Sequence, residues 1–283
     1  MSDSTAVTLR GIAAAAACLM VLAAAGVVVP AVAGDGESVT IERALIGEVG
    51  AKTPEISTDE LRAALAHGSA AVLDTRPHAE FAMGHIPGAI NVSAKPGMPA
   101  SLYVSDVAEI GRVLGGRKDT AIVLYCNGPF CGKSKRLADE LLADGYTKVR
   151  RYQLGIPVWR ALGGVAQIED EGLRRVIDHD ETAVLIDTRD SSVFAAGSVA
   201  GARNIPRRGV LEGKDVGEVK KAKDDGRLPM NDHNTRIVVL GTDGREARYV
   251  AEALTREAFH NVAFYDGTFA QAQSVLKPTG RRR

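Results

Sequence analysis

The sequence has few cysteines, no excess of charge of either sign and no histidine pairs at metal-ligand spacing. Three cysteines in 283 residues are too few for a disulfide-stapled small domain. The 35 Lys+Arg balance the 35 Asp+Glu, which argues against nucleic-acid binding through a basic face. We expect no metal site, because the six histidines are scattered along the chain. They are His67, His78, His85, His179, His233 and His260.

The first 33 residues have the pattern of an export signal. Arg10 is followed by an uncharged run over residues 11–34, and Ala31-Val32-Ala33 precedes Gly34. A short positive region, an apolar run and a small-residue site are typical of a secretory signal. The run is also long enough to span a bilayer as an uncleaved membrane anchor. In both cases we expect the rest of the chain to be periplasmic or extracellular.

The exported part contains two cysteines and an internal repeat. Cys126 and Cys131 could close a disulfide in an oxidising compartment or stay reduced for chemistry. Residues 71–76 recur at 184–189, and Phe81 and Phe194 share the same offset. A repeat of this length indicates a duplicated domain. The expected divisions are a lead-in at 34–54, one domain at 55–165, a second at 166–275 and a basic tail at 276–283.

Each repeat alternates strand and helix patterns. Short apolar strands between helices predict a buried parallel sheet with helices on both faces, which is an α/β fold. Ser57 and Glu60 form a capping box at the start of the first helix. In the first repeat the expected strands are 70–73, 89–92, 121–125 and 149–152, and the later helices are 78–82, 103–114 and 133–144.

The loop after strand 121–125 is the candidate site. Ligands of α/β sheets bind beyond the carboxyl ends of the strands, where Cys126 lies. The N–H groups and dipole of the helix expected from about Lys133 would stabilise a thiolate. Gly128 and Gly132 permit the positive φ angles of a tight anion cradle. The alternative is an inert cysteine at a strand end. The expected substrate-binding residues are Asn127, Gly128, Pro129, Phe130, Cys131, Gly132 and Lys133.

Further motifs surround this loop in the sequence. They are Asp74-Thr75-Arg76, the Gly-His-Ile-Pro-Gly-Ala run at 84–89, and Gly155 with Trp159. With Cys126 at a strand end, the chain resembles the rhodanese superfamily, and specifically a tandem-domain rhodanese-like protein. The resemblance implies two domains, each with a five-stranded parallel sheet flanked by helices. It also implies transfer of sulfane sulfur through a persulfide on Cys126, with no cofactor.

The resemblance gives three other residues a structural role. Asp74 and Arg76 are expected to form an ion pair beside the sheet, and His85 to anchor a turn. A direct catalytic role for His85 is the alternative.

Two departures from the family pattern affect the prediction. Cys131 is a second cysteine that the usual family loop lacks, and it favours a redox-capable pair; the alternative is a loop-packing residue. In the second repeat Gly241 takes the place of the nucleophile, while Asp243 and Glu246 bring negative charge. We therefore expect the second repeat to be catalytically silent.

The sequence thus predicts an exported sulfurtransferase with one active domain. Its donor would be a small sulfur-containing anion such as thiosulfate, and its acceptor a thiol or a protein. One rival is a thiol–disulfide redox protein that uses Cys126 and Cys131. A second is a non-enzymatic binding module. A phosphatase is less favoured, because Lys133 stands where the loop would need an arginine.

Overall fold

The computed structural model describes residues 40–95, 97–99, 105–129 and 131–277. The predicted leader at 1–33 and residues 278–283 of the predicted tail lie outside this part. Both repeats belong to one unit, residues 39–283. Within the described part, no helix combines the length and apolar character needed to cross a membrane.

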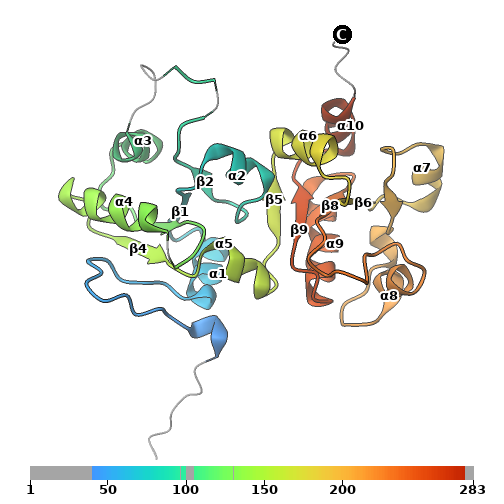
Figure 1. The fold of residues 1–283 in the computed structure, drawn as a ribbon, viewed down its shortest axis with the longest axis horizontal. Coiled ribbons are helices and arrows are strands. Elements are labelled where there is room, and N and C mark those ends of the chain that lie inside the picture. Colours follow the sequence, from blue (N-terminus) through green and yellow to red (C-terminus); the bar gives the residue numbers. More distant parts are fainter. Residues whose placement is uncertain (1–39, 96, 100–104, 130, 278–283) are drawn as a thin grey trace, which may run out of the picture. The chain divides into compact units, whose positions relative to one another are not determined.

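The first repeat is a parallel sheet between helices (Figure 1). Its strand order is β2-β1-β3-β4. Ser57 caps the first helix through the predicted capping box with Glu60. The elements are η1 (Ile41–Arg43), α1 (Thr58–His67), β1 (Ala71–Asp74), α2 (His78–Met83), β2 (Ile90–Asn91), α3 (Asp106–Val113), β3 (Ile122–Tyr125), α4 (Gly132–Ala143), β4 (Val149–Tyr152) and α5 (Gly155–Ala161).

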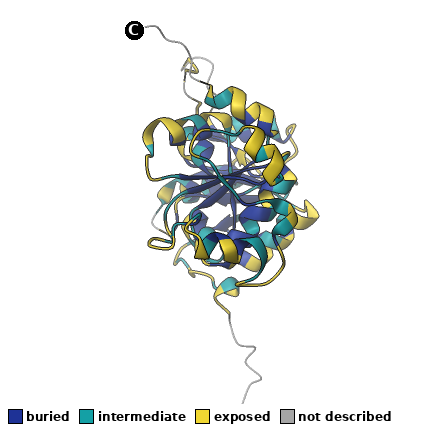
Figure 2. Cartoon of the chain, turned by 90° about the vertical axis from the view of Figure 1, so that its right-hand side faces the viewer, coloured by how far each residue is buried: buried dark blue, intermediate teal, exposed yellow. Residues whose placement is uncertain are grey.

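Alternate residues of these strands pack into two separate hydrophobic cores, one on each face of the sheet. Val72 and Val123 pack with the side chains of α1 and α5, whereas Leu73 and Leu124 pack with those of α3 and α4. Successive strand side chains point to opposite faces, so each face of the sheet is covered by helices. The strands at the centre of Figure 2 are accordingly mostly dark blue, whereas yellow lies on the outer sides of the helices and on the loops.

The first sheet has four strands, and the expectation of five was wrong for this repeat. Glu55 makes a single parallel bridge with Arg151 at the place where a fifth strand would pair with β4. Pro54 has no N–H to donate, and Ser57 already caps α1. Only one residue is therefore free to pair.

The second repeat has the expected five parallel strands, in the order β5-β9-β8-β6-β7. Read from β7, this order matches that of the first sheet, with β5 in the position of Glu55. The elements are β5 (Ala166–Ile168), α6 (Asp170–His179), β6 (Val184–Asp187), α7 (Ser191–Ala196), β7 (Arg203–Asn204), η2 (Arg207–Gly209), α8 (Gly217–Asp224), β8 (Ile237–Leu240), α9 (Gly244–Arg256), β9 (Val262–Tyr265) and α10 (Phe269–Leu276).

The two repeats are joined by backbone contacts. His85 and Gln167 exchange two backbone hydrogen bonds, of 3.0 and 2.9 Å. Helices α2 and α6 approach closely at Gly172, where an added Cβ would lie 2.0 Å from the Ala82 carbonyl oxygen. Only glycine allows this approach, so Gly172 fixes the packing of the repeats against each other.

The lead-in is held to the first repeat by a carboxylate. Glu48 accepts hydrogen bonds from Lys135 (2.7 Å), Arg151 (2.6 Å) and Gln153 (2.8 Å). The bonds from Lys135 and Arg151 lower the pKa of Glu48 to about 2.

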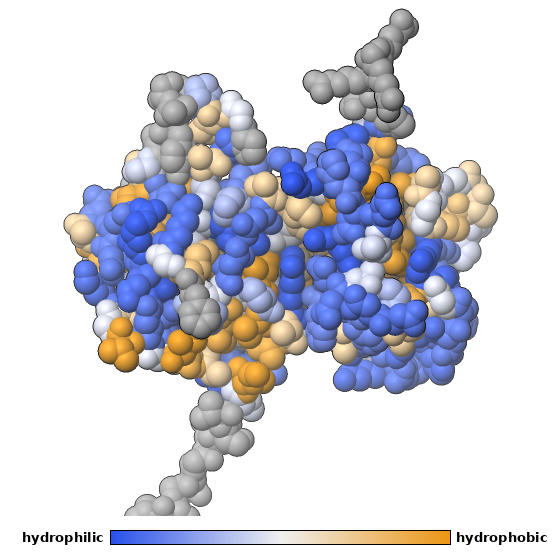
Figure 3. All heavy atoms as spheres, viewed as in Figure 1, coloured by the Kyte–Doolittle hydropathy of each residue, from blue (hydrophilic) through white to orange (hydrophobic). Residues whose placement is uncertain are grey.

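Hydrophobic residues gather at the lower left of Figure 3, on the side of the first repeat where η1 lies. Exposed hydrophobic residues of the lead-in are Ile41, Leu45, Ile46 and Val49.

Candidate functional site

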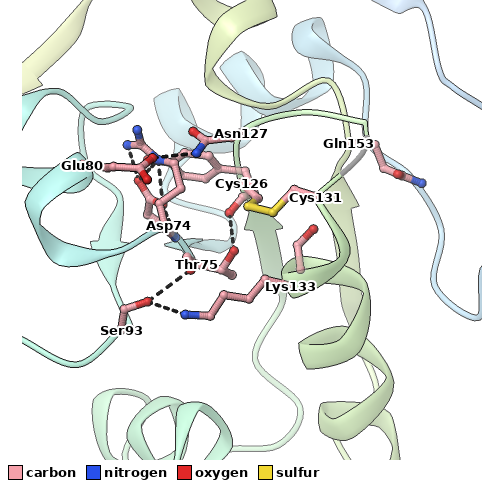
Figure 4. The surroundings of a disulfide bond; sticks show 12 residues. Asp74, Thr75, Glu80, Ser93, Cys126, Asn127, Cys131, Lys133 and Gln153 are labelled. Atoms are coloured by element: carbon pink, nitrogen blue, oxygen red, sulfur yellow. Dashed lines mark hydrogen bonds and ion pairs between the residues drawn. A yellow bond between two sulfur atoms is a disulfide. The ribbon is translucent and has the colours of Figure 1, made fainter.

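A disulfide joins the two ends of the loop between β3 and α4 (Figure 4). Cys126 directly follows β3 and is 5% exposed. Cys131 is the residue before the first turn of α4. Their Cα atoms are 6.2 Å apart, within the range that a disulfide requires. The structure therefore brings together the two cysteines for which the sequence left pairing open.

Two glycines let the backbone fold tightly around Cys126. Gly128 has φ +112° and Gly155 has φ +66°. A Cβ on Gly155 would lie 2.4 Å from the Gly128 nitrogen and 2.5 Å from the Cys126 carbonyl oxygen. That carbonyl accepts a hydrogen bond from the Ile156 N–H at 3.2 Å. Gly132 is the first residue of α4 and has no positive φ, so the expectation of a second left-handed glycine there was wrong.

The N-terminus of α4 faces this loop without a side-chain cap. The helix begins at Gly132, one residue before the expected start. Cys131, its N-cap residue, offers no capping hydrogen bond from its side chain. The first N–H groups of a helix have no partner within it and carry positive partial charge. This end of α4 can therefore stabilise a thiolate or another anion at the loop.

Lys133 is directed away from the two sulfur atoms. Its ammonium donates to Ser93 Oγ at 2.8 Å and lies 3.9 Å from Asp106 Oδ2. Ser93 in turn donates to the Thr75 carbonyl at 3.1 Å. Figure 4 shows this chain of contacts running beside the disulfide. In this conformation Lys133 orders the neighbouring segment and does not lie over Cys126.

The remaining loop residues differ in their contacts. Asn127 is exposed and donates from Nδ2 to Glu80 Oε2 at 2.6 Å. Pro129 is exposed. Phe130, which the sequence placed in the binding loop, lies outside the described residues.

Asp74 and Arg76 form a buried ion pair, with 2.6 Å between Arg76 Nη2 and Asp74 Oδ2. Arg76 Nη2 also donates to the Gly84 carbonyl at 2.9 Å. The same arrangement recurs in the second repeat, where Arg189 pairs with Asp187 at 2.6 Å. That repeat has no cysteine. The recurrence favours a structural role for the pair.

His85 is buried, with 2% exposure. Its Nδ1 is 3.0 Å from the Phe81 carbonyl oxygen, and its Nε2 is 3.5 Å from Glu169 Oε1 of the second repeat. Burial lowers the pKa of His85 to about 4, so the ring is neutral at neutral pH. These contacts are those of a turn anchor between the repeats.

Within the described residues, no cluster of three or more His, Cys, Asp or Glu side chains has the arrangement of a metal site.

Comparison with protein families matches the rhodanese-like domain at residues 57–162 and again at 170–274. The chain belongs to the rhodanese-like family. The resemblance and the two-domain α/β fold drawn from the sequence are thereby confirmed.

The relatives that match this chain include an enzyme and a transcriptional regulator. Human thiosulfate:glutathione sulfurtransferase is 34% identical over 116 residues, which cover 38% of this chain and 95% of that enzyme. The HTH-type transcriptional regulator Rv0324 of Mycobacterium tuberculosis is 31% identical over 115 residues, 41% of this chain. The chain spans 45% of the length of that regulator. At the level of the family, the match to the human enzyme supports a sulfurtransferase, whereas the match to the regulator does not bear on this activity.

The solved structure of SseA from Escherichia coli, a 3-mercaptopyruvate sulfotransferase by its description, is 21% identical with a TM-score of 0.33. The match covers 76% of this chain and 98% of that one.

The second rhodanese-like repeat fills its own anion cradle. Residues 241–243 link β8 to α9, where residues 126–131 link β3 to α4. Asp243 Oδ1 accepts from the backbone N–H groups of Arg245 and Glu246, each at 3.0 Å. A Cβ at Gly241 would lie 2.7 Å from the Ala247 nitrogen. The N–H groups of Arg245 and Glu246 are therefore already occupied, and a side chain at position 241 has no room.

Several residues around the rhodanese-like loop carried no signal in the sequence. Ser93, Glu80 and Arg160 lie in three different segments, and only the fold brings them near residues 126–133. Thr75 belongs to a motif of the family, but nothing in the sequence indicated that its side chain binds the end of β3, the strand that leads into the loop. Its Oγ1 donates to the Tyr125 carbonyl at 3.0 Å.

Proposed function

We propose that the chain is a sulfurtransferase that carries sulfane sulfur as a persulfide on Cys126. The observation that supports this most is the position of Cys126, buried at the end of β3 and facing the uncapped N-terminus of α4. Membership of the rhodanese-like family and the name of the human relative agree with the reaction class.

The reaction begins with reduction of the disulfide. Two equivalents of a thiol reductant supply two electrons and two protons, which leaves Cys126 and Cys131 as thiols. The Cys126 thiolate then attacks the outer sulfur of thiosulfate; the sulfur–sulfur bond of the donor breaks, and sulfite leaves with the electron pair. An acceptor thiolate attacks the terminal sulfur of the persulfide and regenerates the Cys126 thiolate.

The loop stabilises charge in both steps. The N–H groups at the start of α4 lower the pKa of a thiolate placed there and offer hydrogen bonds to a departing sulfite. Gly128 and Gly155 keep the loop backbone close enough for this. The second repeat supports the first through packing and takes no part in the chemistry.

A second candidate function is thiol–disulfide exchange by Cys126 and Cys131. The disulfide between them favours it. In this reaction an external thiolate attacks one sulfur, forms a mixed disulfide and releases the other cysteine as a thiolate. Persulfide formation and thiol exchange are separable, because only the first requires a sulfane-sulfur donor.

We also propose that the protein is exported. The support is the apolar run at 11–34 with its small-residue site. Sequencing the N-terminus of the protein from its native host distinguishes a cleaved signal from an uncleaved membrane anchor. A start near Gly34 indicates a cleaved signal, and an intact start at Met1 or Ser2 on membrane-bound protein indicates an anchor.

Mass spectrometry tests the sulfurtransferase. The reduced protein is treated with thiosulfate, and added sulfur is located by peptide. We expect one extra sulfur atom on Cys126 in wild type and in Cys131→Ser, and none in Cys126→Ser. Loading in Cys126→Ser would contradict the assignment. A wild type that exchanges its disulfide with thiols but never gains sulfur would favour the redox function.

A further inference from the structure

Arg160 of α5 has a guanidinium without a partner among the described residues. Its Nε is buried and has no hydrogen-bond partner. Its Nη2 lies against Gly84, where an added Cβ would be 2.5 Å away. Burial and the neighbouring cations Arg236 and Arg76 lower its pKa to about 10. A buried cation costs free energy unless an anion pairs with it.

The two neighbouring arginines already have partners. Arg76 holds Asp74 and the Gly84 carbonyl. Arg236, directly before β8 of the second repeat, lies 3.2 Å from Asp180 Oδ2 and 3.4 Å from the Met83 carbonyl oxygen. Their charges are therefore largely satisfied within the protein. The charge of Arg160 remains available for a ligand.

These three arginines line one cavity beside the sulfur-carrying loop. The cavity has a volume of about 320 Å³ and is also lined by Asn127 and Ile156. Asn127 follows Cys126 directly, and the Ile156 N–H binds the Cys126 carbonyl. The cavity therefore adjoins the backbone of the proposed nucleophile. Its size suits a small molecule.

The other charges of the cavity favour one side of it for an anion. Glu80 lines the wall next to Asn127 and accepts its hydrogen bond at 2.6 Å. An anionic group would be repelled there and attracted to Arg160. A ligand with a negative group at one end and sulfur chemistry at the other fits this distribution of charge.

We propose that Arg160 binds the carboxylate of a small organic thiol that accepts the sulfur from Cys126. This proposal rests on the proposed sulfurtransferase function. The guanidinium offers two N–H donors to a carboxylate in one plane. The bound thiolate then attacks the terminal sulfur of the Cys126 persulfide, which yields an organic persulfide and the Cys126 thiolate.

Kinetics with two acceptors test the assignment. Sulfur transfer from thiosulfate is measured with 3-mercaptopropionate and with uncharged 2-mercaptoethanol. Arg160→Gln should lower kcat/KM for the carboxylate-bearing thiol roughly 10- to 100-fold, mainly through KM, because a charged hydrogen-bonding partner is lost. The value for 2-mercaptoethanol should change less than about twofold, and Arg160→Lys should recover part of the loss.

Arg208→Gln is the matched control, because Arg208 is 84% exposed and does not line the cavity. It should leave both acceptors unchanged. Equal losses for both thiols in Arg160→Gln would overturn the assignment. Slower loading of Cys126 by thiosulfate in that variant would show that Arg160 binds the sulfur donor, which would also overturn the assignment of Arg160 to the acceptor.

Thermal unfolding gives a readout that does not depend on activity. Propionate should raise the Tm of wild type and Arg208→Gln but not of Arg160→Gln. Without propionate, Arg160→Gln should unfold no lower than wild type, because the variant removes a partly buried, unpaired charge. A lower Tm, an equal shift in all three proteins or no shift in wild type would each contradict the site. The protein could show a propionate-induced rise in Tm that requires Arg160 and yet never load sulfur. That result would support the carboxylate site and contradict the proposed sulfurtransferase function.

Discussion

Cys131, the residue before the first turn of α4, forms a disulfide with Cys126, the residue after β3. The bond links a strand end to a helix start across a loop that contains Gly128. In this state Cys126 carries no thiolate. Reduction is therefore required before any sulfur transfer, and Cys131 is positioned to close the bond again.

Replacing Cys131 by serine should make oxidative inactivation permanent. Mild peroxide converts the Cys126 thiolate to a sulfenic acid, and the Cys131 thiol then displaces water to form the disulfide. Wild type should recover its sulfur loading with a reductant, whereas Cys131→Ser should lose it progressively as Cys126 oxidises further. The measurement is sulfur loading after a peroxide series, with and without reductant. Identical recovery in the two proteins would leave Cys131 as a packing residue.

Gly155→Ala should disrupt the loop. The new Cβ meets the Gly128 nitrogen and the Cys126 carbonyl oxygen, and φ +66° disfavours a side chain. We expect a loss of stability of about 2 kcal/mol or more and a loss of sulfur loading. Gly163→Ala is the matched control, because Gly163 has φ +79° with no atom within 4 Å of its Cβ position. If both variants lose loading equally, backbone strain alone explains the effect.

Gly172→Ala should destabilise the packing between the repeats. Its Cβ would overlap the Ala82 carbonyl oxygen at 2.0 Å, so helices α2 and α6 must separate. We expect a loss of about 1–3 kcal/mol in the free energy of unfolding, measured by chemical denaturation. Gly111→Ala in helix α3 provides the comparison, because the nearest atom to its Cβ position is the Tyr146 hydroxyl at 3.4 Å. Equal stability of both variants with wild type would show that α2 and α6 can adjust.

The stability of the protein should fall as the pH drops from about 6.5 to 4. Burial lowers the pKa of His85 from 6.5 to about 4 in the folded state, so the unfolded chain binds a proton first. The free energy of unfolding should decrease by up to about 3 kcal/mol over this range. His85→Gln should have a smaller decrease, as followed by urea denaturation at each pH. His67→Gln should behave like wild type, because His67 is exposed. A slope unchanged in His85→Gln would reject this cause.

Much of the fold follows from local pattern. The apolar runs before Asp74 and Cys126 became β1 and β3 within one residue of the expected limits, since short apolar segments between helices are typical of buried parallel strands. The helix expected at 103–114 is observed at Asp106–Val113, while residues 103–104 lie outside the described part. The fifth strand of the first repeat is reduced to the bridge at Glu55, because Pro54 lacks an N–H and Ser57 caps α1. The apolar pattern of the strands does not reveal how far this pairing extends.

The sequence alone determined the duplication, the rhodanese-like family, Cys126 as the candidate nucleophile and the absence of its counterpart at Gly241. Each of these depends on residue identity at a strand end or on a repeat, which order along the chain preserves. Only the tertiary structure decided that Lys133 turns to Ser93, that Asp243 fills its own cradle and that Arg160 is left unpaired beside the loop. Those outcomes depend on distances between side chains from separate segments, which are set when the sheets and helices pack.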